Sequence, residues 1–320
     1  MNRIQKPIAL IVPVFNEGDG LAVFYQEVKK VLSTLPEYHW KIIFVDDGSE
    51  DNSWQVISEL SEQYQDVKGL LLSRNFGKEN ALTAGVQAVG EEIDAVIFID
   101  ADLQHPPELI PQLLAEWQKG FEIVSGIRKD VADYSVIKRM GSKLFYTLMA
   151  WFSDIEVIPN NTDYRLLDKT VVSFLCQFTE RTRMFRGLID WMGFNKTHLT
   201  FSAPARNTGT QQYSFIKLFR LAINSLTSFS LLPLRITGYI GLFIVLSSGS
   251  LLTYMLFTHL LEWTVFTPLA FFVVFNTFLL GILLSGLGLV ALYIGHIHTE
   301  VVQRPLYIIR KKIGNYKDCI

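Results

Sequence analysis

The chain has 320 residues, which is long enough for one large domain or two smaller ones. Its formal net charge of −2 argues against a protein that binds nucleic acid, because phosphate-backbone binding normally requires a strong basic excess. Its two cysteines, Cys176 and Cys319, form neither a metal-ligand spacing nor a disulfide framework, so we expect a reducing compartment. Hydrophobic residues make up 49% of the chain, and their concentration after Leu231 predicts a globular part followed by a membrane part.

Residues 8–130 alternate between short apolar runs and stretches with helical periodicity. The brief, β-branched runs predict strands, at residues 8–14, 41–47, 67–73, 94–100 and 121–126. The periodic stretches predict helices, at residues 21–35, 53–64, 79–89 and 108–119. This alternation predicts an α/β fold with a mostly parallel sheet covered by helices on both faces. In such sheets, ligands bind beyond the carboxyl ends of the strands.

Two basic amphipathic segments follow, at about residues 136–152 and 213–229. The first carries Lys138 and Arg139 near one end. Such a helix either lies in a membrane interface, with its cations at the level of the headgroups, or packs on the sheet like any other helix. The presence of two such helices, the second running into an apolar segment, favours the interface.

Residues 236–257 and 268–294 carry no charge, and each run is long enough to cross about 30 Å of hydrocarbon. A buried hairpin in a soluble protein is the alternative, which these lengths disfavour. We therefore predict a cytoplasmic domain at 1–230 that includes the interface helices, a two-helix transmembrane hairpin at 231–298 and a cytoplasmic basic tail at 299–320. The cytoplasmic side follows from positive charges that flank the hairpin, at Arg220, Arg235, Arg304, Arg310, Lys311, Lys312 and Lys317.

Acidic residues follow the predicted strand at 94–100. Asp100 and Asp102 lie two residues apart where this strand gives way to a loop, so they could converge on one hard divalent cation such as Mg²⁺ or Mn²⁺. Taken alone, such a pair is more often solvated, and the neighbouring His105 is more often a packed residue than a ligand.

Two other predicted strands end in the same way. Asp46 and Asp47 end the second strand, and Asn16 and Glu17 follow the first. Several carboxylates in one crevice would repel one another unless they shared a cation or bound sugar hydroxyls. Asp46 could accept hydrogen bonds from a base or a ribose.

Four motifs occur in order along the chain: PVFNE at 13–17, VDDGS at 45–49, SRNFGK at 73–78 and DADLQ at 100–104. This series resembles the GT-A domain, a Rossmann-like fold, of family 2 glycosyltransferases. More narrowly, it resembles the polyprenyl-phosphate glycosyltransferases, the group of bactoprenol glucosyltransferase and dolichol-phosphate mannose synthase. The resemblance extends through NTDYRL at 161–166 and the two predicted spans, so it covers nearly the whole chain. It implies an integral protein of a bacterial-type inner membrane, with its catalytic domain on the cytoplasmic face.

The resemblance also implies roles for individual residues. The nucleotide-sugar would be held by Pro13, Phe15, Glu17, Asp46, Asp47, Asp100 and Arg206. Mg²⁺ or Mn²⁺ would bind at Asp100, Asp102 and Gln104. The lipid phosphate would lie at Arg128, Lys138, Arg139 and Ser142. Asp163 and Arg128 would be the catalytic residues, the first near the reacting sugar and the second between the donor and acceptor phosphates.

One loop departs from the family pattern. Arg206, Gly209 and Tyr213 match it, but Gln211 and Gln212 stand where serine and lysine are usual. A lysine that would neutralise the donor diphosphate is therefore missing from this loop. Either Arg206 suffices, or the affinity for the donor is weaker.

The resemblance implies transfer of a hexose, with UDP-glucose the expected donor, to an undecaprenyl-type or dolichyl-type phosphate. A phosphate monoester is already anionic at neutral pH, so its attack needs little general-base help, and a single displacement predicts inversion. Cations must stabilise the leaving diphosphate. Two alternatives stay open: a processive polysaccharide synthase, whose usual Gln-X-X-Arg-Trp motif is missing here, and a non-catalytic membrane scaffold that binds nucleotide-sugar. A homo-oligomer is possible in each case.

Overall fold

The computed structural model describes residues 5–90, 92–129, 161–180, 184–202, 253–254, 257, 261 and 267–314. The chain divides into two compact units. The first consists of Met1–Tyr146, Ile155–Gln212 and Arg304–Ile320, and the second of Thr147–Asp154 and Tyr213–Gln303.

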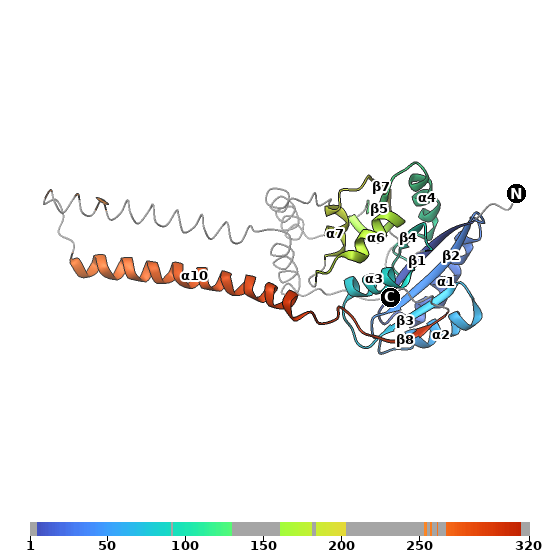
Figure 1. Ribbon diagram of the computed structural model, residues 1–320, viewed down its shortest axis with the longest axis horizontal. Helices are drawn as coiled ribbons and strands as arrows, with labels where there is room; N and C mark the ends of the chain where they lie inside the picture. The colour runs from blue at the N-terminus through green and yellow to red at the C-terminus, as the bar shows by residue number, and fades with distance from the viewer. Residues whose placement is uncertain are drawn as a thin grey trace. The chain divides into compact units, whose positions relative to one another are not determined.

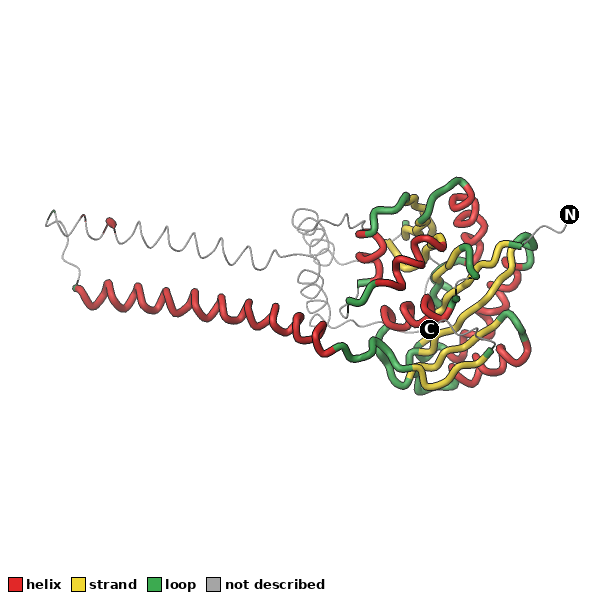
Figure 2. The backbone as a smooth tube through the Cα atoms, viewed as in Figure 1, coloured by secondary structure: helices red, strands yellow, loops and turns green. Residues whose placement is uncertain are grey.

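The first unit is built on an eight-stranded sheet with the order β7-β5-β6-β4-β1-β2-β3-β8 (Figures 1 and 2). The strands are β1 (Lys6–Val14), β2 (Tyr38–Asp46), β3 (Val67–Leu72), β4 (Ala95–Phe98), β5 (Ile123–Arg128), β6 (Asn161–Asp168), β7 (Lys196–Phe201) and β8 (Ile309–Ile313). Only β6 and β8 run against the direction of the other strands. The predicted α/β fold with a mostly parallel sheet is confirmed, as are the five predicted strands.

Helices cover both faces of the sheet, as predicted. They are α1 (Gly18–Leu32), α2 (Ser53–Gln63), α3 (Lys78–Ala88), the 3₁₀ turn η1 (Pro107–Leu109), α4 (Ile110–Gln118), α6 (Lys169–Gln177) and α7 (Phe185–Trp191). Helices α1, α2 and α4 share one core with the strands, and α3 and α6 pack on the other face. In α1, the buried side chains Leu21, Phe24, Val28 and Leu32 recur at helical spacing, which explains why this segment lies against the sheet.

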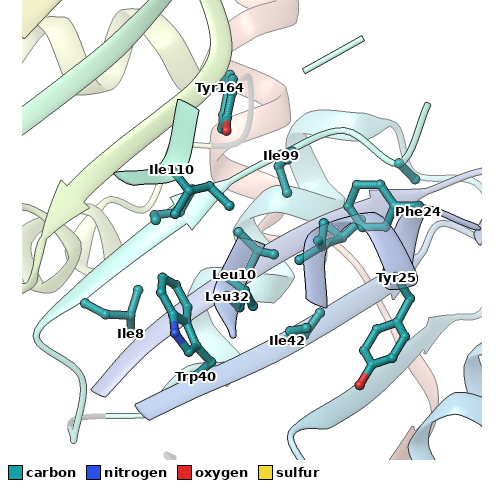
Figure 3. Close-up of a cluster of buried hydrophobic side chains, with 14 of the residues drawn as sticks. Ile8, Leu10, Phe24, Tyr25, Leu32, Trp40, Ile42, Ile99, Ile110 and Tyr164 are labelled. Atoms are coloured by element: carbon teal, nitrogen blue, oxygen red, sulfur yellow. The ribbon is translucent and has the colours of Figure 1, made fainter. Parts of the chain in front are cut away.

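The core on the α1 face is filled by residues that alternate along the central strands. Ile8 and Leu10 of β1 and Ile42 of β2 are fully buried and belong to the same core cluster as Phe24 of α1 (Figure 3). Alternation of this kind fixes the register, because a slip by one residue would turn each strand's core-facing side chains to the other face. A rigid centre therefore positions the loops that follow β1, β2 and β4.

The last strand of the sheet comes from the C-terminal end of the chain. The sequence analysis placed 299–320 in a tail, whereas the structure pairs β8 antiparallel with β3, and the backbone N–H of Ser73 donates to the carbonyl of Ile308 at 2.8 Å. Three successive basic side chains on β8, Arg310 to Lys312, are exposed. Charged residues on an edge strand oppose pairing with another chain, so β8 closes this side of the sheet.

In the second unit, α10 (Pro268–Val302) begins with a proline, whose fixed φ and missing N–H suit the first turn, and is followed by Gln303 in the left-handed conformation. Across the part of the chain that the structure describes, no helix combines the length and apolarity needed to cross a membrane. The predicted span at 236–257 and the amphipathic helices at 136–152 and 213–229 lie largely or wholly outside the described residues. Both spans and both interface helices therefore stay predictions.

Candidate active site

The carboxyl ends of β1, β2 and β4 lie side by side, with β1 in the middle. Val14 is opposite Asp46 in the β1–β2 pair, and Ile11 is opposite Phe98 in the β1–β4 pair. Since β2 and β4 flank β1 on opposite sides, the chain order reverses here, which is where open α/β sheets bind their ligands. The loops that follow β1, β2 and β4 therefore begin at the same edge of the sheet, as expected for parallel strands.

Asp46 ends β2 and is completely buried. Its Oδ1 accepts a hydrogen bond from the N–H of Ser49 at 2.7 Å, while its Oδ2 has no donor among the described residues. Burial raises the pKa of this carboxyl, although the bond from Ser49 opposes the rise. Pro13, Phe15 and Glu17 lie at the neighbouring end of β1, and the ring of Phe15 is 44% exposed. The adjoining ends of β1 and β2 therefore carry an exposed aromatic side chain and a buried carboxylate oxygen without a donor among the described residues.

Asp47 binds the backbone of the loop after β3, a structural role that was not predicted from the sequence. Its two carboxylate oxygens accept the N–H groups of Phe76 and Gly77, at 2.7 and 2.8 Å. These bonds tie the loop after β3 to the end of β2. Gly48 makes the close approach possible, because it has φ +71° and a Cβ there would lie 2.4 Å from the carbonyl carbon of Arg74. The predicted contact of Asp47 with a nucleotide-sugar stays a prediction.

The loop after β4 carries the three predicted metal ligands. Asp102 Oδ1 accepts the N–H of Gln104 at 3.0 Å, and Leu103 between them has φ 57°, so the loop turns sharply. Gln104 Oε1 accepts a bond of 3.4 Å from Arg128, at the end of β5. The Nε of Arg128 is buried and has no acceptor among the described residues, which leaves a donor for a phosphate.

The donor set of this loop fits a hard cation. Asp100, Asp102 and Gln104 offer only oxygen atoms, the ligands that Mg²⁺ and Mn²⁺ prefer, and such ions usually take one or two carboxylates and complete their shell with water and substrate phosphates. Within the described ranges, no three His, Cys, Asp or Glu side chains gather as a metal site of their own.

His105 has a packing role. Its Nδ1 accepts the backbone N–H of Asp100 at 3.1 Å, and its ring stacks on Tyr164 with 4.9 Å between the ring centroids. Burial lowers the pKa of the imidazole, which favours the neutral form that can accept this bond. His105 thus fixes the first residue of the acidic loop.

Asp163 lies near the start of β6, at the same edge of the sheet, and is 6% exposed. Arg186 of α7 donates to both of its oxygens, at 2.5 and 2.9 Å. The ammonium of Lys78 lies 2.9 Å from Asp163 Oδ2 and 2.6 Å from Asp100 Oδ1. The two cations outweigh burial and hold the pKa of Asp163 well below its usual range, so this residue stays a carboxylate.

Sequence reasoning missed two members of this cluster and undervalued a third. Lys78 and Glu79 begin α3 directly after the loop at the end of β3, so the rule about strand ends could have found them. The sequence alone does not distinguish Arg186 from a residue on an ordinary solvated helix face. Glu79 Oε2 accepts the N–H of Phe185 at 2.8 Å and thereby joins α3 to α7, and burial raises the pKa of Glu79 to about 7.

The remaining predicted residues cannot be placed. Lys138, Arg139, Ser142 and Arg206 lie outside the described residues, as do Gln211 and Gln212. Their assignment to the lipid phosphate and the donor loop stays a prediction.

Comparison with known proteins shows the family. The model of glycosyl transferase family 2 matches residues 9–179. The chain is 35% identical over 302 residues to an uncharacterised glycosyltransferase of Synechocystis, with 94% of each chain covered. It is 36% identical over 304 residues to the SfII prophage-derived bactoprenol glucosyl transferase of Shigella flexneri, with 95% of this chain and 97% of that protein covered. It is 34% identical over 309 residues to the uncharacterised glycosyltransferase YkcC of Bacillus subtilis, with 96% and 94% covered. The chain therefore belongs to glycosyl transferase family 2 and is a glycosyltransferase.

Proposed function

We propose that this enzyme transfers a hexose from a nucleotide-sugar to a polyprenyl phosphate. The observation that carries the donor half is Asp46, a buried carboxylate with one oxygen that lacks a donor among the described residues. A buried acceptor without a partner costs free energy, and an N–H or O–H of a bound nucleoside would satisfy it. The acceptor half is supported by similarity over nearly the full length to proteins named bactoprenol glucosyl transferase, for which glucose is the sugar. We therefore favour UDP-glucose as the donor.

The proposed reaction is a single displacement. An oxygen of the lipid phosphate attacks the anomeric carbon, the bond from that carbon to the diphosphate oxygen breaks, and the electron pair leaves with the nucleoside diphosphate. This course inverts the anomeric centre. The nucleophile is already anionic, so no described residue has to remove a proton from it.

Charge stabilisation is the larger task for the protein. Arg128 offers its buried Nε to a phosphate, beside the loop that carries Asp100 and Asp102. Mg²⁺ or Mn²⁺ bound by Asp100, Asp102 and Gln104 would neutralise charge that develops on the leaving diphosphate. Asp163 remains ionised between Lys78 and Arg186, so it is suited to holding cations in place and unsuited to donating a proton.

We also propose that the enzyme is integral to the inner membrane, with the catalytic unit on the cytoplasmic face. The support is the sequence: no Asp, Glu, Lys or Arg occurs from Pro268 to Thr299, and Arg304 and the basic residues of β8 follow. A cytoplasmic site would give access to both a nucleotide-sugar and a membrane-borne phosphate.

The test is a donor panel with the full-length protein in detergent and a short polyprenyl phosphate. UDP-glucose, UDP-galactose, UDP-N-acetylglucosamine and GDP-mannose, each radiolabelled, are supplied with Mn²⁺ or Mg²⁺. Label that moves into the organic phase and is released by mild acid supports the proposal. Long insoluble polymer would instead indicate a polysaccharide synthase, and binding without transfer would indicate a scaffold.

A further inference from the structure

Lys78 is the only residue whose side chain joins two of the acidic positions at this edge of the sheet, within the part of the chain that the structure describes. Its Nζ lies 2.6 Å from Asp100 Oδ1 and 2.9 Å from Asp163 Oδ2. Its side chain is 41% exposed, whereas that of Asp163 is 6% exposed. The side chain of Lys78 is therefore more exposed than those of its two carboxylate partners, of which Asp100 is 26% exposed.

The two carboxylates depend on Lys78 to different degrees. Asp163 also accepts two hydrogen bonds from Arg186, so it keeps a cationic partner if Lys78 moves. Asp100 has no other lysine or arginine within ion-pair distance among the described residues, and the nearby His105 uses its Nδ1 to accept the backbone N–H of Asp100. Lys78 is thus the charge partner of Asp100 in this structure.

A divalent cation and the ammonium of Lys78 would compete for Asp100. Two positive charges about 4 Å apart repel each other even near a protein surface, where water screens them in part. An ion ligated by Asp100 would therefore weaken the pairing of Lys78 with that carboxylate. Asp163 would keep the lysine nearby, and the N–H groups that pointed at Asp100 would become available to another anion.

We propose that Lys78 alternates between two partners: Asp100 in the free enzyme and the donor diphosphate once a divalent cation is bound. In the first state it holds the acidic loop in place without a metal. In the second it supplies a positive charge that the donor loop lacks, because Gln211 and Gln212 stand there in place of the usual serine and lysine. This inference rests on the proposed nucleotide-sugar donor.

The inference requires Lys78→Gln to change two affinities in opposite directions. Without the competing ammonium, Mn²⁺ binding in the absence of nucleotide should become about threefold to tenfold tighter. Binding of uridine diphosphate in the presence of Mn²⁺ should become about tenfold weaker, since a charge-assisted contact is lost. Free Mn²⁺ is measured by electron paramagnetic resonance and uridine diphosphate by calorimetry, both on the full-length protein in detergent.

The matched control is Lys169→Gln. Lys169 pairs with Asp94 at 3.3 Å, at the opposite end of β4 from Asp100, so both affinities should stay unchanged. Lys78→Arg retains the charge and should keep uridine diphosphate affinity within about threefold of wild type.

The measurements distinguish a failure of the proposed role of Lys78 from a failure of the proposed donor. If Lys78→Gln weakens Mn²⁺ binding, or leaves uridine diphosphate binding unchanged, the alternation of Lys78 is overturned while the donor assignment stands. If wild type binds Mn²⁺ but no uridine nucleotide, the proposed donor is wrong and the diphosphate role of Lys78 falls with it. If Lys78→Gln does not fold, Lys78→Arg decides: a tenfold loss of uridine diphosphate affinity would contradict a role based on charge.

Discussion

Asp46 and Asp47 are adjacent in the chain, but we expect their substitution by asparagine to affect the free energy of unfolding differently. Asp47 is 4% exposed and spends both oxygens on the N–H groups of Phe76 and Gly77. An asparagine at position 47 can accept only one of these bonds and turns its NH₂ group towards the other N–H. Asp46→Asn keeps the acceptor for Ser49 and removes a buried charge whose second oxygen has no donor among the described residues.

The magnitudes follow from the geometry. A hydrogen bond to a charged group contributes about 1.5 to 3 kcal/mol, so the two bonds of Asp47 represent about 3 to 6 kcal/mol before the cost of burying the charge. Burial outweighs both bonds in setting the raised pKa of Asp47, so part of that sum is offset. We expect Asp47→Asn to lower the free energy of unfolding by about 2 to 3 kcal/mol. Asp46→Asn should change it by less than about 1 kcal/mol or raise it.

Thermal and urea unfolding of the full-length protein in detergent measure the free energy of unfolding. Calorimetric titration measures the affinity for uridine diphosphate. Asp46→Asn should lose about tenfold in nucleotide affinity while it keeps its stability. Glu50→Gln, on the exposed part of the same loop, is the control and should change neither. The assigned structural role of Asp47 would be contradicted if Asp47→Asn were as stable as wild type, or if Asp46→Asn were the less stable of the two variants.

Three further predictions concern the groups around the site. Glu79 has a pKa of about 7, above its ordinary value of 4.5, so its contribution to stability is complete below about pH 4.5 and is lost as the pH rises to about 7. Glu79→Gln should abolish that loss, of at most about 3 kcal/mol, in unfolding curves recorded from pH 5 to 8; a wild-type curve that is flat there would contradict this. Arg186→Met leaves Asp163 with Lys78 alone and should cost about 1 to 3 kcal/mol, because the arginine is partly exposed. The low pKa of Asp163 means that its contribution is lost as the pH falls below about 4, and acid unfolding of Arg186→Met should begin at a higher pH than in wild type. Gly48→Ala meets the backbone of Arg74 at a positive φ and should cost about 2 kcal/mol or more, measured by thermal unfolding, whereas Gly20→Ala, with no atom within 4 Å, should cost little.

The parallel half of the sheet could be predicted because its strands are buried on both faces and so form continuous apolar runs. The same rule about strand ends brought Asp46 and Asp100 to one edge. The strand β6 gave no such signal, since NTDYRLLD carries three charged residues in eight, and the fully buried Arg165 breaks any apolar pattern. The burial of β6 depends on its pairing with β4 and β5, which cannot be predicted from the periodicity of its own residues.

The contacts among Lys78, Asp163 and Arg186 could not be predicted from the sequence for a related reason. Its members come from α3, β6 and α7, and only the packing of these elements sets the distances between them. Individually, each has the residue type of a solvated surface position. Their charges become informative only when burial and proximity are known together.

The pairing of β8 with β3 has a consequence for biosynthesis. Lys312 lies opposite Leu70, so the outermost pairing of the sheet joins segments separated by most of the chain. Contacts of such long sequence separation form late, and an unpaired strand edge is prone to association with other chains. During translation, β3 must wait with an open edge until α10 and the residues after it have left the ribosome. The sheet can therefore be completed only after α10 has been synthesised. A chain that stops before Ile309 would leave the edge of β3 exposed to other chains.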